Sequence, residues 1–380
     1  MSARRTGPTA KTLAAFADAR SRHFAPSELA AMLAVFGKPR RTSFRVNAMR
    51  ATDAAAVDGA LAAVRQRLSE LHARNRDTVR IRRCAWNSHA FQLSDPSVRA
   101  RQLMDLDAHA RGLLHFQSLS SMIPAACFDP SPLVGPASGG ADAAGAQPRW
   151  LLDMCAAPGG KTTQLVEAFA ARTSNVVVAN EIHPLRIQRL ERNIAALVPE
   201  PVRPRVHQVL GDGRRLAVAA HGADPAAIAQ SKLPRLMDAI LLDAPCSGEG
   251  TFSTLEPQTI AVWSLDFVAK MQRLQRQLLD RAFHLLRPGG QLVYSTCTLG
   301  PEENEANIEW VVGQHPSLEI APLHLDLADP AINGGLANFR PAGGPSLGSR
   351  SGLPLHLALR VLPTAEYEGF FVCRLVKRAA

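Results

Sequence analysis

The chain changes its pattern of hydrophobic and polar positions near Trp150. After this point, short apolar runs alternate with longer amphipathic segments, the pattern of buried strands joined by helices. Such alternation predicts an α/β fold with a mostly parallel, doubly wound Rossmann-like sheet. Strands are expected at residues 151–154, 175–180, 205–210, 239–243 and 291–295.

Helices are expected between these strands. One should follow the first strand directly, one lies near 184–197, and a long one includes 271–285, where apolar residues recur at helical spacing. Arg287-Pro288-Gly289-Gly290 then supplies a stop signal. Two last segments, about 355–362 and 368–376, are predicted to be closing strands.

The part of the chain before residue 112 has shorter elements and predicts a smaller α+β domain. Its expected order is a helix over 12–36 broken near Pro26, a strand at 40–47, a helix over 53–74 and short strands within 78–93.

Composition suggests the domain boundaries. Residues 129–148 are rich in Pro, Gly, Ala and Ser and predict a surface loop or linker, and residues 334–353 predict another loop. We therefore divide the chain into a basic N-terminal domain (1–111), a connecting helix and loop (112–148) and a larger α/β domain (149–380).

The positive charge is concentrated in the first of these parts. The formal net charge is +10, and residues 1–111 hold 20 Lys+Arg against 9 Asp+Glu, so the remainder carries a balance of −1. This asymmetry favours an N-terminal domain that faces a polyanion such as RNA. A solvated basic surface with no partner is the alternative.

Other features limit the class of protein. No uncharged apolar run of about 18 residues is present, so no membrane helix is predicted. Residues 1–20 lack the apolar core of a secretory signal, with an Arg-rich transit peptide as the alternative. The six cysteines are scattered without metal-site or disulfide-framework spacing, which suits a reducing compartment. We expect a cytoplasmic, monomeric protein without a bound metal.

The first predicted strand leads into a loop with the chemistry of a ligand site. Cys155-Ala156-Ala157-Pro158-Gly159-Gly160-Lys161-Thr162 combines small residues with two glycines before a helix, so its backbone can approach a ligand closely. A phosphate-binding P-loop would need glycine at position 155, where this chain has cysteine, and that alternative fails.

Acidic residues follow the next two strands. Glu181 lies where an acid usually holds ribose hydroxyls, and Asp212 could accept from an adenine amino group. Taken singly, Glu181 could be a helix N-terminal charge and Asp212 part of a turn. With Asp243 after the fourth strand, the three together suggest an adenosine-containing ligand without a phosphate tail.

Two cysteines follow neighbouring strands. Cys246 lies in Asp243-Ala244-Pro245-Cys246-Ser247-Gly248, and Cys297 lies in Ser295-Thr296-Cys297-Thr298. A thiolate is suited to attack on an electron-poor ring. A zinc deaminase would need Pro-Cys-x-x-Cys, which is not present here. Packing is the expected role of the remaining cysteines, Cys84, Cys127 and Cys373, and also of Cys155.

These motifs together resemble the Sun/Nop family of RNA cytosine-C5 methyltransferases. The loop after the first strand and the paired Pro-Cys and Thr-Cys motifs carry the resemblance. Further matches are Arg45-Val46-Asn47, Phe116-Gln117-Ser118-Leu119-Ser120-Ser121, Pro301-Glu302-Glu303-Asn304-Glu305 and Glu368-Gly369-Phe370-Phe371. The resemblance covers residues 100–380 well and the N-terminal region loosely.

The resemblance implies S-adenosylmethionine as the methyl donor and cytosine in rRNA or tRNA as the acceptor. Residues 155–161 would hold the methionine part of the donor, Glu181 its ribose and Asp212 its adenine. Cys297 would be the nucleophile and Cys246 would assist release. Lys161 and Asp243 would contact the reacting base, with Asp243 at the donor–base junction.

The residues alone leave the nucleophile open, because DNA cytosine methyltransferases attack with a Pro-Cys cysteine. DNA methylation with attack by Cys246 is therefore one alternative. A catalytically idle RNA-binding assembly factor is another, although the presence of Lys161, Asp243, Cys246 and Cys297 argues against it.

Overall fold

The computed structural model describes most of the chain. The described residues are 8–71, 79–134, 147–218, 232–233, 235–325, 327, 339–342 and 352–379. Within these ranges, none of the helices combines the length and the apolar character that a membrane span requires. The predicted loop 129–148 lies partly outside the described residues, as does the predicted loop 334–353.

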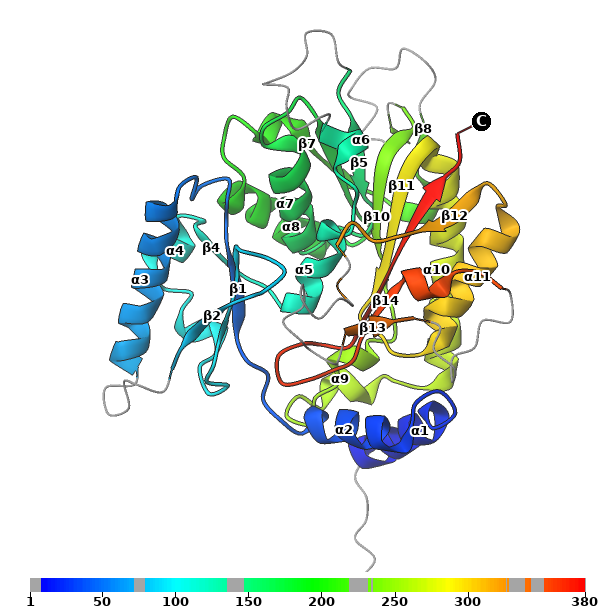
Figure 1. Cartoon of the computed structure of the whole chain (residues 1–380), viewed down its shortest axis with the longest axis horizontal. Helices are drawn as coiled ribbons and strands as arrows, with labels where there is room; N and C mark the ends of the chain where they lie inside the picture. Colours follow the sequence, from blue (N-terminus) through cyan, green and yellow to red (C-terminus); the bar gives the residue numbers. More distant parts are fainter. Residues whose placement is uncertain are drawn as a thin grey trace, which may run out of the picture.

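The centre of the molecule is a nine-stranded mixed sheet (Figure 1). Its main order is β13-β14-β15-β11-β10-β5-β6-β7, and β12 also pairs with β15. The parallel strands are β5 (Trp150–Asp153), β6 (Val176–Glu181), β7 (Val206–Leu210), β10 (Met237–Asp243) and β11 (Leu286–Thr296).

The prediction of five strands in a Rossmann-like sheet is confirmed. The remaining strands run antiparallel: β12 (Leu318–Ala321), β13 (Phe339–Pro341), β14 (Leu359–Val361) and β15 (Phe370–Lys377). Strand β13 falls inside the segment predicted as a loop, so that prediction is wrong for residues 339–341. Its three residues pair with β14 and are too few to show periodicity.

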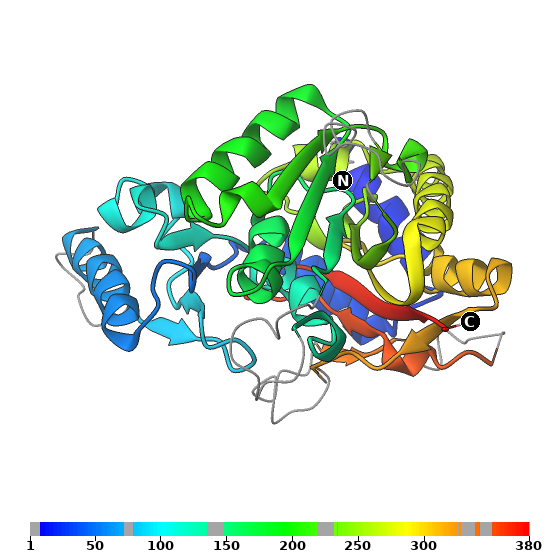
Figure 2. The same ribbon diagram turned by 90° about the horizontal axis from the view of Figure 1, so that it is seen from above.

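Helices cover both faces of this sheet (Figures 1 and 2). One core forms where α5, α7 and α8 pack on side chains such as Val177, Leu241 and Val293. The other forms where α10 and α11 pack on their neighbours in the strands, such as Val178 and Leu242. Buried on both faces, the strands read as continuous apolar runs. The helices are α5 (Leu119–Ala126), α7 (Gly160–Leu165), α8 (Pro184–Leu197), α10 (Leu265–Leu285) and α11 (Glu305–Gln314).

A smaller lobe lies beside the large sheet, at the left in Figure 1. Its four-stranded sheet has the order β2-β3-β1-β4, and helix α3 (Ala54–Leu71) packs against it through Leu61, Val64 and Leu68. The strands are β1 (Ser43–Val46), β2 (Ile81–Arg83), β3 (Ala90–Leu93) and β4 (Leu114–Phe116). The lobe therefore has the α+β character that the sequence predicts, and it extends beyond residue 111 because β4 belongs to it.

The buried Arg45 joins this lobe to the large sheet. Its guanidinium, from β1, donates to Glu167 Oε2 at 2.7 Å and to Thr163 Oγ1 at 2.5 Å. Both partners lie in the helical segment that follows β5, so the small lobe is fixed against the loop at residues 155–160. Short elements complete the fold: α4 (Asp107–Ala110), α6 (Ser131–Val134), α9 (Gln258–Ala261), β8 (Ala217–Val218) and β9 (Lys232–Leu233).

The first two helices are not part of the small lobe. Helices α1 (Pro8–Arg20) and α2 (Pro26–Phe36) lie below the large sheet in Figure 1. Phe16 and Phe36 pack there edge-to-face on Phe252, and Phe16 also packs on Trp263. Aromatic pairs of this kind contribute roughly 0.5–1.5 kcal/mol each beyond the burial of their area. The described part of residues 1–111 is therefore divided between two places in the fold.

Candidate active site

The predicted site residues gather at one edge of the large sheet. Asp153, Glu181 and Asp243 end strands β5, β6 and β10, and Thr296, the last residue of β11, precedes Cys297. Because these four strands are parallel, their carboxyl ends lie at the same edge. The fold thus brings together groups that are more than 100 residues apart in the chain.

The loop between β5 and α7 is held by its neighbours. Gly159 has φ +107°, and a Cβ there would lie 2.9 Å from Leu190 Cδ1, so the position needs glycine. Helix α8 supports the loop through Arg186, which donates to the carbonyl of Ala157 at 2.6 Å, and Asn193, which donates to that of Pro158 at 2.7 Å. The loop therefore presents a fixed backbone to the end of the sheet.

A first pocket lies between β6, β7 and α10. Its volume is about 330 Å³, and its wall includes Glu181, Asp212 and the exposed side chain of Ile182. The Oδ1 atom of Asn180 is buried in the wall without a hydrogen-bond partner. We call this space the donor pocket. The remaining lining residues are Met154, Cys155, Arg186, Gly213, Arg214, Pro245, Lys270, Met271, Arg273, Leu274, Gln277 and Leu278.

The two acids of the donor pocket differ in their environment. Glu181 is 2% exposed, and its Oε1 accepts from the backbone N–H of His183 at 2.9 Å. Asp212 is less buried and pairs with Arg214 Nη2 at 2.6 Å. Hydrogen bonds from Arg214 hold the pKa of Asp212 below its ordinary value, so this carboxylate is ionised at neutral pH.

A second pocket, with a volume of about 580 Å³, lies between the two lobes. We call it the catalytic pocket, because Lys161, Asp243 and Cys297 line it together. Strand β4 of the small lobe supplies His115 and Phe116 to the opposite wall. Within the described residues, Cys155 is the single residue that lines both pockets.

Lys161 and Asp243 form an ion pair in the catalytic pocket, with Nζ 2.8 Å from Oδ2. Lys161 also donates to Ser121 Oγ at 2.7 Å, and Ser295 Oγ donates to Asp243 Oδ1 at 2.7 Å. Burial alone would lower the pKa of Lys161, but Asp243 outweighs it and raises the pKa, with a smaller contribution from Cys297. The lysine is therefore a stable cation beside Cys297.

The two cysteines of the paired motifs are in contact, with Sγ atoms 3.3 Å apart. Cys297 lines the catalytic pocket, whereas Cys246, which is also half-buried, is absent from the wall of either pocket. The hydrogen bond to Cys297, together with burial, raises the pKa of Cys246 well above that of an ordinary thiol. Cys246 therefore stays a thiol at neutral pH, and Cys297 is the cysteine of the pair that shares its pocket with the ammonium of Lys161.

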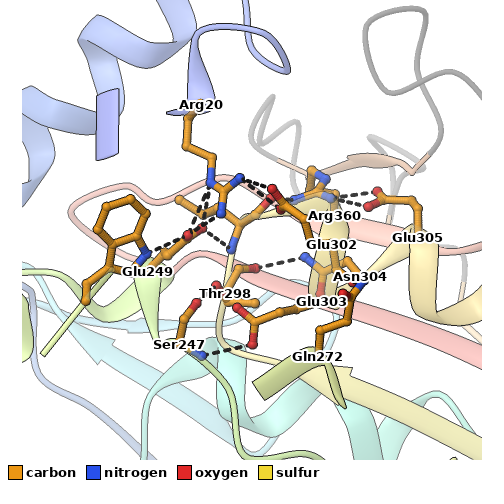
Figure 3. Close-up of polar contacts among 12 residues, drawn as sticks. Arg20, Ser247, Glu249, Gln272, Thr298, Glu302, Glu303, Asn304, Glu305 and Arg360 are labelled. Atoms are coloured by element: carbon orange, nitrogen blue, oxygen red, sulfur yellow. Dashed lines mark hydrogen bonds and ion pairs between the residues drawn. The ribbon is translucent and has the colours of Figure 1, made fainter. Parts of the chain in front are cut away.

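Residues beneath the cysteines fix the two loops to each other. Ser247 Oγ and Thr298 Oγ1 are 2.7 Å apart, and the Ser247 N–H donates to Glu303 Oε2 at 3.0 Å (Figure 3). Burial raises the pKa of Glu303 to about 7. Glu303 belongs to one of the segments that carried the family resemblance, but nothing in that pattern indicated a contact with the Pro-Cys loop.

The structure brings most of the predicted site residues together. Lys161, Asp243 and Cys297 share the catalytic pocket with loop residues 155–158 and 160, while Glu181 and Asp212 line the donor pocket. Ser121 and Ser295, which bind the Lys161–Asp243 pair, were not predicted as site residues. Ser121 lies in a motif matched by resemblance, but a lone serine carries no signal that distinguishes it from a helix cap.

A doubly wound sheet with an acid-lined pocket at its carboxyl edge, next to paired Pro-Cys and Thr-Cys cysteines, defines a Rossmann-like methyltransferase fold. A family model described as 16S rRNA methyltransferase RsmB/F matches residues 144–376. The chain belongs to this family, which confirms the methyltransferase class that the sequence motifs indicated.

Curated relatives agree with this assignment. Ribosomal RNA small subunit methyltransferase F from Klebsiella pneumoniae (strain 342) is 35% identical over 300 residues, which is 78% of this chain and 51% of the relative. The protein of the same name from Escherichia coli O7:K1 is 35% identical over 298 residues, with the same coverage of both chains. The chain spans about half the length of these relatives.

Solved structures share the fold over nearly the whole chain. A methyltransferase homolog from Pyrococcus horikoshii has a TM-score of 0.62 at 25% identity and covers 98% of this chain and 99% of its own. NSun6 from Pyrococcus horikoshii with SFG has a TM-score of 0.65 at 19% identity, covering 96% and 98%. The small lobe therefore has a counterpart in both, since the coverage leaves almost nothing out.

Proposed function

We propose that this protein is an S-adenosylmethionine-dependent RNA (cytosine-C5)-methyltransferase that acts on ribosomal RNA. The observation that carries the proposal is the catalytic pocket, which combines the cysteine of the Thr-Cys motif, Cys297, with the Lys161–Asp243 ion pair. The curated relatives are named as ribosomal RNA methyltransferases, which supports rRNA over tRNA as the acceptor. RNA is thus the partner that we assign to the small lobe, whose strand β4 forms one wall of this pocket.

The residues of the donor pocket fit S-adenosylmethionine. Carboxylates of Glu181 and Asp212 suit ribose hydroxyls and an adenine amino group, and the unpartnered Oδ1 of buried Asn180 is a further acceptor. Residues 155–160 and Asp243 extend the site toward the catalytic pocket and would hold the methionine end. When bound, this cofactor supplies an electrophilic methyl group.

Cys297 performs the first step of the proposed reaction. Its thiolate attacks carbon 6 of cytosine, so that an S–C6 bond forms and the electron pair of the C5–C6 double bond gives carbon 5 nucleophilic character. The Lys161 ammonium beside Cys297 stabilises the thiolate before attack. Lys161 and Asp243 both line this pocket as an ion pair. The pair can therefore hold a proton near ring nitrogen 3 of the adduct.

Cys246 is assigned to the second half of the reaction. Carbon 5, once methylated, must lose its proton, and the released electron pair re-forms the C5–C6 double bond as the S–C6 bond breaks and Cys297 leaves. Cys246, whose sulfur lies 3.3 Å from that of Cys297, is the group that we assign to help this release, directly or through water. Its absence from the wall of the catalytic pocket suits release rather than attack.

The same geometry disfavours DNA methylation with attack by Cys246, because the wall of the catalytic pocket contains Cys297 and not Cys246. The Lys161–Asp243 ion pair at the pocket also argues against a catalytically idle binding factor, which would not need it. A target base must in either case leave its stack to reach Cys297.

The proposal is tested by incubating the protein with radiolabelled S-adenosylmethionine and unmodified ribosomal RNA, small ribosomal subunits, transfer RNA or duplex DNA in parallel. Nucleoside analysis then identifies the labelled base. We expect 5-methylcytidine from ribosomal RNA, naked or assembled. Label in transfer RNA alone would correct the substrate, label in DNA alone would overturn the RNA assignment, and no label despite donor binding would favour the binding role.

A further inference from the structure

Both cysteine loops are attached to one buried carboxylate. Glu249 follows Cys246 by three residues and is 0% exposed. Its Oε1 accepts from Trp263 Nε1 at 2.8 Å, and its Oε2 accepts from the backbone N–H of Leu299 at 3.2 Å (Figure 3). Leu299 follows Cys297 by two residues, so this side chain holds the end of each loop.

Arg20 supplies the counter-charge of this carboxylate. It is the last residue of α1 and is 0% exposed. Its Nη2 donates to Glu249 Oε1 at 2.5 Å, and its Nη1 donates to both oxygens of Glu302 at 2.9 Å (Figure 3). A Cβ at position 300 would collide with the guanidinium, and this position is Gly300. Glycine at this position thus leaves space for an arginine that precedes its partner Glu249 by 229 residues in the sequence.

The backbone transmits the position of Glu249 to the sulfur atoms. The N–H of Gly250, the next residue, donates to the carbonyl of Cys297 at 3.0 Å. On the other side, the Ser247–Thr298 hydroxyl pair joins the residue after Cys246 to the residue after Cys297. A shift of Glu249 therefore moves both cysteines, whereas the donor pocket contains none of these residues.

We propose that Arg20 is a positioning residue for Cys246 and Cys297 and that it acts through Glu249. A buried carboxylate that loses its only cationic partner among the described residues takes up water or moves toward solvent. Glu249 would then release the Leu299 N–H and loosen the spacing of the two loops. Helix α1 precedes residues 144–376, which the family model matches, so the catalytic machinery extends beyond that region.

The primary test uses Arg20→Met, which removes the charge and keeps a long side chain. Hydrogen exchange read by mass spectrometry should become at least tenfold faster in peptides covering 245–252 and 296–301, and stay unchanged around 150–154. The proposal rests on the proposed function for its kinetic arm: kcat of methyl transfer should fall at least tenfold, with KM for S-adenosylmethionine within twofold.

Rescue separates positioning from a loss of stability. In the double variant Arg20→Met/Glu249→Gln, no unpaired charge is buried, and the amide oxygen still accepts from the Leu299 N–H. We expect at least threefold recovery of kcat and of loop protection relative to Arg20→Met. If Arg20→Met does not fold, Arg20→Lys is used instead, because it keeps the charge but loses the forked geometry of the guanidinium. Hydrogen exchange in the same two loops should then become about threefold faster.

Arg287→Met is the matched control. It removes one of two cationic partners of the buried Asp238 at the opposite end of β10: Arg287 Nε lies 2.6 Å from Asp238 Oδ1, and Arg149 Nη1 lies 3.3 Å from it. It should lower the melting temperature without changing kcat or loop exchange. Unchanged loop exchange in both Arg20 variants, exchange that rises everywhere, or no rescue by Glu249→Gln would overturn the proposal. If the wild-type protein transfers no methyl group, the proposed function is refuted. The hydrogen-exchange comparison then decides alone whether Arg20 positions the two loops.

Discussion

Cys246 and Cys297 touch through sulfur atoms 3.3 Å apart, yet only Cys297 faces the catalytic pocket. The contact means that the two thiols cannot ionise independently, since a charge on one disfavours a charge on the other. On the proposed function, this difference in access separates their roles: Cys297 attacks the substrate, and Cys246 assists the release of Cys297.

Substitution of each cysteine should therefore give a different defect. Cys297→Ala should reduce methyl transfer to background and form no covalent RNA adduct, because Cys297 is the cysteine that lines the catalytic pocket beside the Lys161–Asp243 pair. Cys246→Ala should slow turnover and accumulate the adduct, seen as labelled RNA that stays with the protein on a denaturing gel. Cys84→Ala, at a half-buried cysteine of the small lobe, is the control and should keep wild-type turnover. An adduct formed by Cys297→Ala would assign attack to another cysteine, Cys246 or Cys155.

Loss of the cation beside Cys297 should affect chemistry more than binding. Lys161→Met leaves Asp243 without its ionic partner and removes the positive charge that favours the thiolate. We expect kcat to fall on the order of 10²-fold, as for other preorganised electrostatic groups. Alkylation of Cys297 by iodoacetamide at pH 7 should slow as well. Lys38→Met, at an exposed position, should change neither quantity; equal alkylation rates in wild type and Lys161→Met would refute this role.

The buried Glu303 should make stability depend on pH. Burial raises its pKa from 4.5 to about 7, so the folded state keeps a proton that the unfolded chain has lost in this window. The free energy of unfolding should therefore fall as pH rises from 4.5 to 7, by about 1.4 kcal/mol per unit for one proton. Glu303→Gln removes this contribution, and urea unfolding at pH 5, 6, 7 and 8 measures it.

Relative to the wild type, the free energy of unfolding of the variant should increase as pH rises, by about 3 kcal/mol in total between low and neutral pH. Glu256→Gln, at an exposed position, should follow the wild-type profile. A Glu303→Gln profile parallel to that of the wild type would show that the carboxyl group titrates normally in the folded protein.

Two glycines should respond in opposite ways to the same change. Gly159→Ala places a Cβ 2.9 Å from Leu190 Cδ1 at φ +107°, so we expect a loss of about 1–3 kcal/mol of stability and weaker donor binding. Gly59→Ala lies within α3 with no atom near its Cβ, and should stabilise the protein by about 0.5–1 kcal/mol. Thermal unfolding and titration with S-adenosylmethionine measure both effects; a Gly159→Ala protein with unchanged affinity would contradict the role of the loop.

The sequence predicted those parts of the site that depend on strand order. Parallel strands place their carboxyl ends together, so Lys161, Asp243 and Cys297 could be expected at one edge from the pattern alone. It could not predict which cysteine faces the pocket, because that depends on the packing of Ser247 against Thr298 and Glu303. These contacts cross between loops and leave no periodic signal.

The placement of α1 was likewise beyond the sequence pattern. Its basic surroundings and helical spacing suggested that it belonged with the small lobe, but Phe16 packs on Phe252 and Arg20 pairs with Glu249 beneath the large sheet. An aromatic residue or an arginine within a helix identifies a buried face and not the partner of that face. Short strand β13 escaped prediction for the simpler reason that three residues form no pattern.

The donor and catalytic pockets share Cys155 as their single common wall residue within the described chain. One has the exposed Ile182 at its rim, and the other has the exposed Met104 of the small lobe. The two pockets therefore differ in their exposed wall residues, and we infer separate access for the two ligands of the proposed reaction. On the proposed function, steady-state kinetics should show random order of addition of methyl donor and RNA, and a spent donor should exchange while the RNA stays bound to the protein.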